Sequence, residues 1–161
     1  MKACVIFDTR YGNTEKIARS LEAGLRQAGI ETVCANAKDL TFDDSLAQYD
    51  LICVGAPTEW HTASKPTRGL LRELKGIDLS GKYGFAFDTR FAAPLSGSAA
   101  KLIEKELKDR GIVMIASRES AIVAGAKGGA TLLKEGEEER FRQIGARVGS
   151  ALAAKQSIVQ A

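Results

Sequence analysis

Residues 2–18, KACVIFDTRYGNTEKIA, decide the fold of this chain. The apolar run Ala3–Phe7 predicts a strand buried on both faces, as in a parallel sheet. A polar turn, Asp8–Asn13, follows at once, and a helical pattern then begins, with apolar residues four positions apart at Ile17, Leu21 and Leu25. A strand that turns directly into a helix brings the first turn of the helix to the carboxyl end of the strand.

This turn has the chemistry of an anion site. The N-terminus of a helix presents free N–H groups and the positive end of the helix dipole. Thr9, Asn13 and Thr14 add hydroxyl and amide groups, and Gly12 allows the backbone to come close to a phosphate. We therefore expect a phosphate-binding loop here; the alternative is an ordinary strand-to-helix turn with a good N-cap.

The stretch VIFDTRYGNTEKIA resembles the flavodoxin signature, in which an apolar strand is followed by Ser/Thr, two residues and Gly-Asn-Thr. The resemblance continues more weakly over most of the chain. It implies FMN as the cofactor, with the phosphate held by backbone amides and hydroxyls. The residues it assigns to this loop are Thr9, Arg10, Tyr11, Gly12, Asn13 and Thr14.

The same resemblance implies two further loops that clamp the flavin ring. One contains Pro57, Thr58, Glu59, Trp60 and His61, and the other contains Asp88, Thr89, Arg90 and Phe91. Trp60 is expected to stack on the ring, with packing against neighbouring protein as the alternative. Phe91 either stacks on the outer ring face or packs beneath its loop, and His61 either touches the ring or substrate or is solvated.

Two departures from the family bear on redox behaviour. Many flavodoxins carry a glycine in the loop after the third strand, where a peptide flips upon flavin reduction, but residues 56–64 contain none. One-electron-reduced flavin is therefore expected to be less stabilised here. Arg10 and Arg90, with His61 and Lys65, also place positive charge around the site, which predicts a less negative second reduction potential.

The remainder of the chain alternates strands and helices. Strands are expected at 30–35, 50–55, 82–87 and 112–115, and helices at 13–28, 66–74 and 97–110, with a final helix beginning in the acidic run 135–139. One helical turn is expected near 44–47, and residues 117–135 should be irregular, with room for a short strand at 121–123. This alternation predicts an α/β fold with one doubly wound, five-stranded parallel sheet. The resemblance to flavodoxins implies the strand order 2-1-3-4-5.

Composition fits one domain covering residues 1–161, with 155–161 as a C-terminal tail. Hydrophobic residues make up 45% and charged residues 27%, as in an ordinary globular protein. The net charge is +3, but the basic residues form no run or stripe in the sequence, so nucleic-acid binding is not indicated. No segment predicts membrane insertion or a signal peptide, and we expect a cytoplasmic protein with three reduced core cysteines and no metal site.

The tetrapeptide FDTR occurs twice, at 7–10 and 87–90, each time between a strand and a helix. Either two strand-to-helix units have similar turn requirements, or both loops face one ligand from opposite sides. Only the first copy continues as Gly-Asn-Thr, so only the first should hold phosphate.

Three functions are compatible with the sequence. The leading one is an FMN protein that carries electrons between a reductase and an acceptor, with no side-chain acid, base or nucleophile required. The second is a flavodoxin-like NAD(P)H or quinone oxidoreductase, in which His61 and the arginines would contact substrate. The third is a flavin-free binding module on the same fold.

Overall fold

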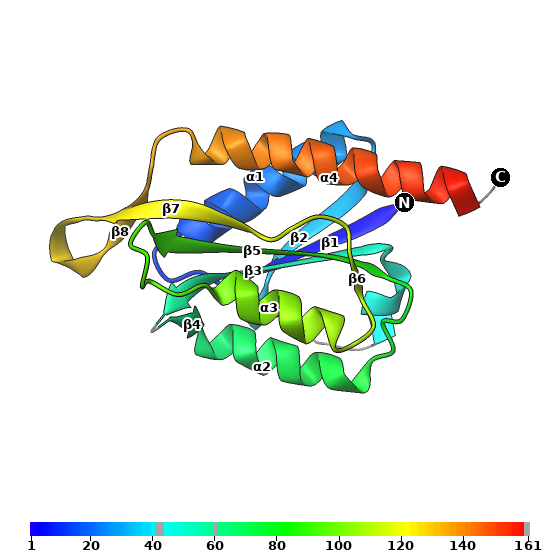
Figure 1. Ribbon diagram of the computed structural model, residues 1–161, viewed down its shortest axis with the longest axis horizontal. Helices are drawn as coiled ribbons and strands as arrows, with labels where there is room; N and C mark the ends of the chain where they lie inside the picture. The colour runs from blue at the N-terminus through cyan, green and yellow to red at the C-terminus, as the bar shows by residue number, and fades with distance from the viewer. Residues whose placement is uncertain (41–43, 60, 160–161) are drawn as a thin grey trace.

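The computed structural model describes residues 1–40, 44–59 and 61–159 (Figure 1). Its strands are β1 (Lys2–Phe7), β2 (Glu31–Asn36), β3 (Leu51–Glu59), β4 (Thr62–Ala63), β5 (Tyr83–Phe91), β6 (Val113–Met114), β7 (Glu119–Gly125) and β8 (Thr131–Leu133). Its α-helices are α1 (Asn13–Gln27), α2 (Lys65–Glu73), α3 (Ala99–Lys108) and α4 (Glu137–Val159). Short 3₁₀ turns lie at Ala37–Asp39, Asp44–Gln48, Leu74–Gly76 and Lys127–Gly129. The turn at Asp44–Gln48 confirms the helical turn expected there.

The main sheet has the order β2-β1-β3-β5-β7-β8. The strands from β2 to β7 pair in parallel, which confirms the predicted order 2-1-3-4-5. The fifth position is divided: β6 pairs with the beginning of β5 and β7 with its end. The single strand expected at 112–115 is therefore longer than β6, and it does not reach β7.

The segment 117–135 was expected to be irregular, with room for a short strand at 121–123. That strand lies within β7, but the rest of the segment is more regular than expected. β7 and β8 form an antiparallel hairpin that makes β8 the edge strand of the sheet. The turn contains Gly128 and Gly129, both with positive φ. The hairpin extends beyond the helical layers at one end of the molecule (Figure 1).

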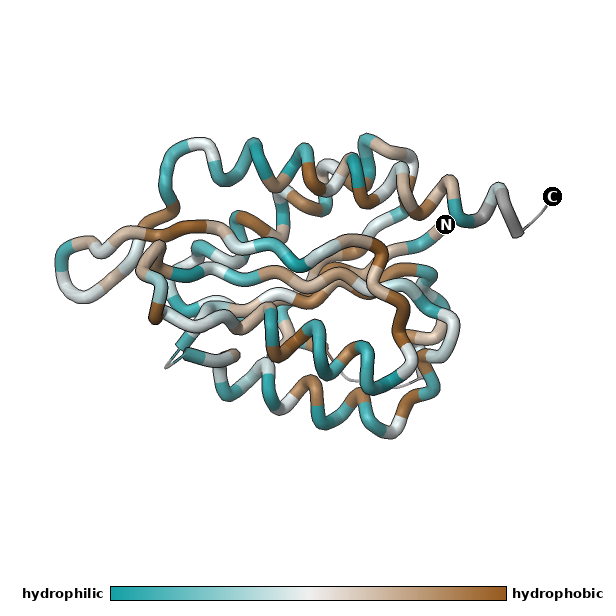
Figure 2. Tube along the Cα trace, in the orientation of Figure 1, coloured by the Kyte–Doolittle hydropathy of each residue, from teal (hydrophilic) through white to brown (hydrophobic). Residues whose placement is uncertain are grey.

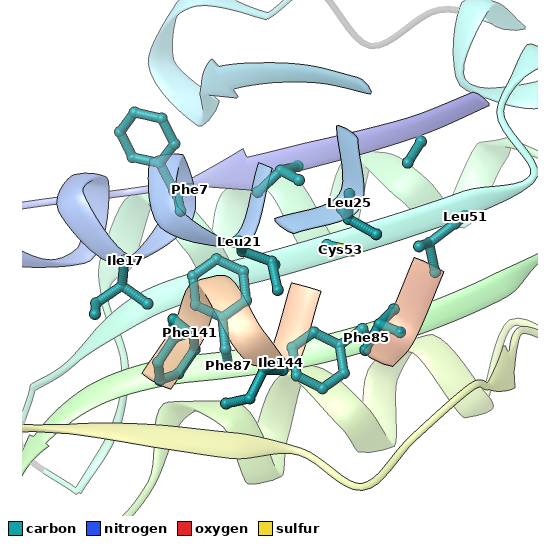
Figure 3. Packing of buried hydrophobic residues seen from close by; sticks show 14 of the residues in the cluster. Phe7, Ile17, Leu21, Leu25, Leu51, Cys53, Phe85, Phe87, Phe141 and Ile144 are labelled. Atoms are coloured by element: carbon teal, nitrogen blue, oxygen red, sulfur yellow. The ribbon is translucent and has the colours of Figure 1, made fainter. Parts of the chain in front are cut away.

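Two layers of helices cover the sheet, α1 and α4 on one face and α2 and α3 on the other (Figure 1). Successive strand residues point to opposite faces, so each strand supplies both cores. Phe87 packs against Phe141 beneath α1 and α4, and Phe7 belongs to the same buried cluster (Figure 3). Ile6 and Ala86, one residue earlier on each strand, pack beneath α2 and α3. Hydrophobic colour accordingly concentrates between the layers (Figure 2).

Two strands run farther than their apolar sequence indicates. β3 continues to Glu59 and pairs with β4 in a short hairpin, where a loop was expected at 56–64. β5 continues through Asp88–Phe91, because Asp88 and Thr89 pair with both neighbouring strands and Arg90 and Phe91 pair with β7. α4 likewise extends to Val159, into the segment expected as a tail. None of the helices in the described ranges is long and apolar enough to cross a membrane.

Candidate functional site

The predicted site residues come together at the carboxyl ends of β1, β3 and β5, which are neighbours in the sheet. Thr9–Thr14 follow β1, Pro57–Glu59 end β3, and Asp88–Phe91 end β5. Pro57 is directly opposite Thr89 in the β3–β5 pairing. Parallel pairing therefore gathers three separate stretches of sequence at one edge, where open α/β sheets bind their ligands.

The loop after β1 has an open cradle at its centre. Gly12 is the N-cap of α1 with a φ of 83°, and a Cβ added there would meet nothing within 4 Å. Its N–H donates to the Thr9 hydroxyl over 3.0 Å, which tightens the turn. No side chain caps α1, so the N–H groups of its first turn are available to solvent or to an anion. This backbone fits the phosphate of FMN.

Asn13 and Thr14 are buried beneath this loop. The Asn13 amide donates to both the carbonyl and the hydroxyl of Thr131, each over 2.9 Å. The Thr14 hydroxyl lies 3.0 Å from the Thr89 hydroxyl. The loop is thus tied to the β7–β8 hairpin and to the end of β5. Thr131 was not among the predicted site residues, because no local pattern links it to a residue 118 positions earlier.

The repeated FDTR has a structural explanation on the opposite face. Asp8 accepts a 2.6 Å hydrogen bond from Ser64, the N-cap of α2. Asp88 accepts a 2.7 Å bond from Ser98, the N-cap of α3. Each aspartate therefore fixes the start of one helix, while the threonine that follows it lies on the α1 side of the sheet. Serine before each predicted helix was a usable N-cap signal for Ser64 and Ser98.

Asp88 belongs to the protein interior more than to the surface of the site. It is completely buried, and one carboxylate oxygen accepts from Thr58, Ser98 and the Ala100 N–H over 2.7–3.1 Å. The other oxygen, Oδ1, has no hydrogen-bond partner among the described residues. Oδ1 of Asp8 likewise accepts no hydrogen bond there, but it lies 3.5 Å from the Lys38 ammonium group. Thr58 also accepts from the Ala99 N–H, so it joins β3 to α3.

Charge at the rim is more balanced than the sequence suggested. Arg10 lies 3.7 Å from Glu59 and stacks over the exposed Tyr11 ring, with 5.3 Å between guanidinium carbon and ring centre. The Arg90 Nε donates to the Phe91 carbonyl. Glu59 thus offsets part of the positive charge on which the less negative potential was based.

His61 occupies a left-handed conformation that the absence of glycine had argued against. Its φ is 68°, and it has the only positive φ among the described non-glycine residues. Its backbone bridges to Gly97, where a Cβ would lie 2.3 Å from the His61 Cα. The side chain is exposed. Trp60, expected to stack on the flavin, lies outside the described residues.

Aromatic surface borders this edge of the sheet. Tyr11 is 45% exposed and Phe91 48% exposed, so core packing beneath the loop does not account for Phe91. Both rings are available to a flat ligand or a protein partner.

The three cysteines take no part in this site. All are free thiols, and burial raises the pKa of Cys4 to about 12. A thiol that stays protonated is a poor nucleophile and metal ligand. In the described ranges, no three His, Cys, Asp or Glu residues gather in a way that could hold a metal.

Comparison with known proteins decides the family. The flavodoxin family profile matches residues 5–144. The chain belongs to the flavodoxin family. It is 29% identical over 92 residues to a flavodoxin of Clostridium saccharobutylicum, covering 55% of this chain and only 56% of that protein. It is 30% identical to an NAD(P)H dehydrogenase (quinone) of Azorhizobium caulinodans, covering 86% of each.

Comparison with solved structures shows the same kind of fold. A flavodoxin from the domain Archaea superimposes with a TM-score of 0.81 at 19% identity, covering 95% of this chain and 99% of that one. For this flavodoxin-family chain, membership implies FMN as the cofactor, in agreement with the cradle at Gly12.

Proposed function

We propose that this chain binds FMN and transfers electrons between a reductase and an acceptor protein. The observation that carries the proposal is the uncapped first turn of α1, opened by Gly12 and rigidly held by buried Asn13 and Thr14. Flavin supplies the redox chemistry when bound. The protein's own contribution is to hold and orient the ligand, which requires no side-chain acid or base. The cytoplasmic location stays a prediction.

Roles can be assigned within this proposal. The backbone N–H groups of Asn13 and Thr14 and the Thr9 hydroxyl would hold the phosphate, while the Gly12 N–H stays bonded to Thr9. The side chains of Thr14 and Asn13 keep the loop in shape through Thr89 and Thr131. Pro57–Glu59, Trp60 and His61 would border one side of the ring, with Thr89, Arg90, Phe91 and Tyr11 on the other. Asp88 would act indirectly, by holding β3 against α3.

Comparing FMN with riboflavin tests the phosphate cradle. Riboflavin lacks only the phosphate, so we expect it to bind at least about 100-fold more weakly, since charge-assisted hydrogen bonds contribute ~1.5–3 kcal/mol each. Quenching of flavin fluorescence measures both affinities on the purified chain. Thr14→Val should reduce the ratio of the affinity for FMN to the affinity for riboflavin, because it loosens the loop.

Thr32→Val is the matched control. Thr32 is equally buried, but its hydroxyl bonds to Ile30 at the opposite end of the sheet. It should leave the ratio unchanged. Equal affinity for FMN and riboflavin in the unaltered chain would overturn the phosphate cradle on which the proposal rests. No binding of either flavin would overturn the proposal and favour a flavin-free module.

A quinone oxidoreductase is the second candidate. It is favoured by the Azorhizobium relative, which aligns over 86% of both chains. Steady oxidation of NAD(P)H by the FMN-loaded protein, with a quinone as the sole acceptor, would support this activity. Reduction only in the presence of a separate reductase would support the carrier.

A further inference from the structure

Helix α2 carries a stripe of cations that is invisible as a run in the sequence. Lys65, Arg68 and Arg72 lie on the helix and Lys75 on the 3₁₀ turn that follows it, all with exposed side chains. Spacings of three and four residues place them on one side of the helix, within an arc of about 80°. The sequence-based conclusion that basic residues form no stripe is thus wrong for the folded chain.

These four cations are unpaired, unlike most arginines of the protein. Across residues 1–40, 44–59 and 61–159, none of the four has an acidic partner within ion-pair distance. Most other arginines are matched with carboxylates, many on their own helix: Arg10, Arg19, Arg26, Arg110, Arg118, Arg140 and Arg142. The α2 stripe is therefore positive charge that the fold leaves uncompensated.

The stripe lines a groove between α2 and α3. The groove has a volume of about 430 Å³, with all four cations on its α2 side and apolar contributions from Leu71 and Leu102. Its one carboxylate, Glu106, lies 2.9 Å from Arg110. Figure 1 shows the two helices side by side along the same face of the sheet.

Charge is concentrated in this groove. Four cations and one carboxylate give it a charge of +3, which equals the formal net charge of the whole chain. The rest of the molecule is therefore neutral on balance. A local field of this kind attracts negatively charged partners and speeds their association.

We propose that this groove docks an acidic, partly apolar segment of a partner protein. The four cations extend about 15 Å along the helix axis, too far for a single phosphate to contact all of them. The apolar residues between them suit side chains that accompany carboxylates in a peptide. A small free anion would use neither feature.

The groove also adjoins the candidate site. α2 begins next to Ser64, which is bonded to Asp8 at the end of β1. A partner lying along α2 would therefore reach the edge that carries the phosphate loop. That this partner is the electron donor or acceptor rests on the proposed function; the docking itself does not.

A glutamate-rich peptide with interspersed leucines, labelled with fluorescein, is a suitable probe. Its fluorescence anisotropy should rise upon binding to the purified chain at low ionic strength, and a peptide with glutamine in place of glutamate should not bind. Arg68→Gln/Arg72→Gln should weaken binding at least about tenfold, as for loss of close charge pairs at an interface. Both side chains are exposed, so the fold should be retained.

Lys134→Gln/Lys155→Gln is the matched control, since it removes the same charge from exposed positions outside the groove. It should change binding less than about twofold. Equal weakening by both double variants would overturn the proposal, because only net charge would then matter. Competition by inorganic pyrophosphate at the same concentration as the peptide would also overturn it and assign the groove to small anions.

The flavin titration is performed on the same preparations. Peptide binding without flavin binding would retain the groove and reject the electron carrier. Flavin binding without peptide binding would do the reverse.

Discussion

The hydroxyls of Thr14 and Thr89 meet at 3.0 Å beneath the candidate phosphate loop, 75 residues apart in the chain. Thr14 is 1% exposed and Thr89 5%, so neither hydroxyl can readily exchange its partner for water. This bond joins the first turn of α1 to the second FDTR copy. The loops of the two FDTR copies are thus physically coupled.

Removing one of the two hydroxyls should lower the free energy of unfolding by more than half of the loss caused by removing both. Thr14→Val or Thr89→Val leaves a buried hydroxyl unpaired, and we expect each to lower the free energy of unfolding by about 1–3 kcal/mol. The double variant should lose less than the sum, because no orphaned hydroxyl remains. Urea unfolding of all four proteins measures this coupling; strict additivity would show that the bond contributes nothing.

Replacing His61 with glycine should stabilise the protein. A side chain in the left-handed region costs about 1–2 kcal/mol, of which glycine's greater freedom in the unfolded chain returns about half. His61→Gly is therefore expected to raise the free energy of unfolding by about 0.5–1 kcal/mol. Gly97→Ala should lower it, since the new Cβ would strike the His61 backbone. A melting temperature that falls for His61→Gly would contradict this reading of the loop.

Replacing glycine with alanine should have opposite effects on stability in two of the helices. A Cβ at Gly145 of α4 would lie 2.3 Å from the Leu21 carbonyl oxygen of α1, so Gly145→Ala must push the helices apart. We expect a loss of about 1–3 kcal/mol or more. Gly69 of α2 has nothing within 4 Å of the added Cβ, and Gly69→Ala should gain about 0.5–1 kcal/mol. Thermal unfolding should move in opposite directions for the two variants.

Glu104 should make stability depend on pH. Burial raises the pKa of Glu104, but hydrogen bonds from Arg118 and Lys108 outweigh it, and the net pKa is lowered from 4.5. A lowered folded pKa adds stability above the unfolded value near 4.5, and this stability is lost as pH falls through the folded pKa. Glu104→Gln should cost about 1 kcal/mol at neutral pH, since both cations are partly exposed.

The difference between Glu104→Gln and the unaltered chain should shrink as pH falls below 4.5, when followed by urea unfolding. Asp109→Asn, which breaks the exposed pair with Lys105, serves as the control. Asp109→Asn should change the free energy of unfolding little at neutral or at acidic pH. A pH-independent effect of Glu104→Gln would show that its packing, not its charge, matters.

Much of the fold followed from short-range patterns. The apolar run 3–7 and the four-residue spacing of Ile17, Leu21 and Leu25 predicted β1 and α1 correctly, because burial of one face imposes those periods locally. Alternation of strands and helices then predicted a parallel sheet, and the resemblance to flavodoxins implied its strand order. The parallel sheet in turn predicted that the three loops meet at its carboxyl edge.

Elements with weak local patterns were missed in whole or in part. Only the centre of β7, at 121–123, was foreseen, and β8 has three residues; β7 extends beyond that centre because the end of β5 offers a free edge, and β8 pairs in turn with β7. The ends of β3 and β5 have the same origin. Pairing across a sheet is a property of the assembled edge, and no single segment carries its signal.

By itself, then, the sequence determined the strand–turn–helix unit at 2–27, the family it resembles and the order of the layers. Only the tertiary structure decided which distant residues meet: Thr14 with Thr89, Asn13 with Thr131, and Asp8 with Ser64. It also decided that the cations of α2 have no ion-pair partner among the described residues, while most other arginines do. The physical reason is that secondary structure reflects the spacing of neighbours, whereas partners across the sheet are chosen by packing of the whole chain.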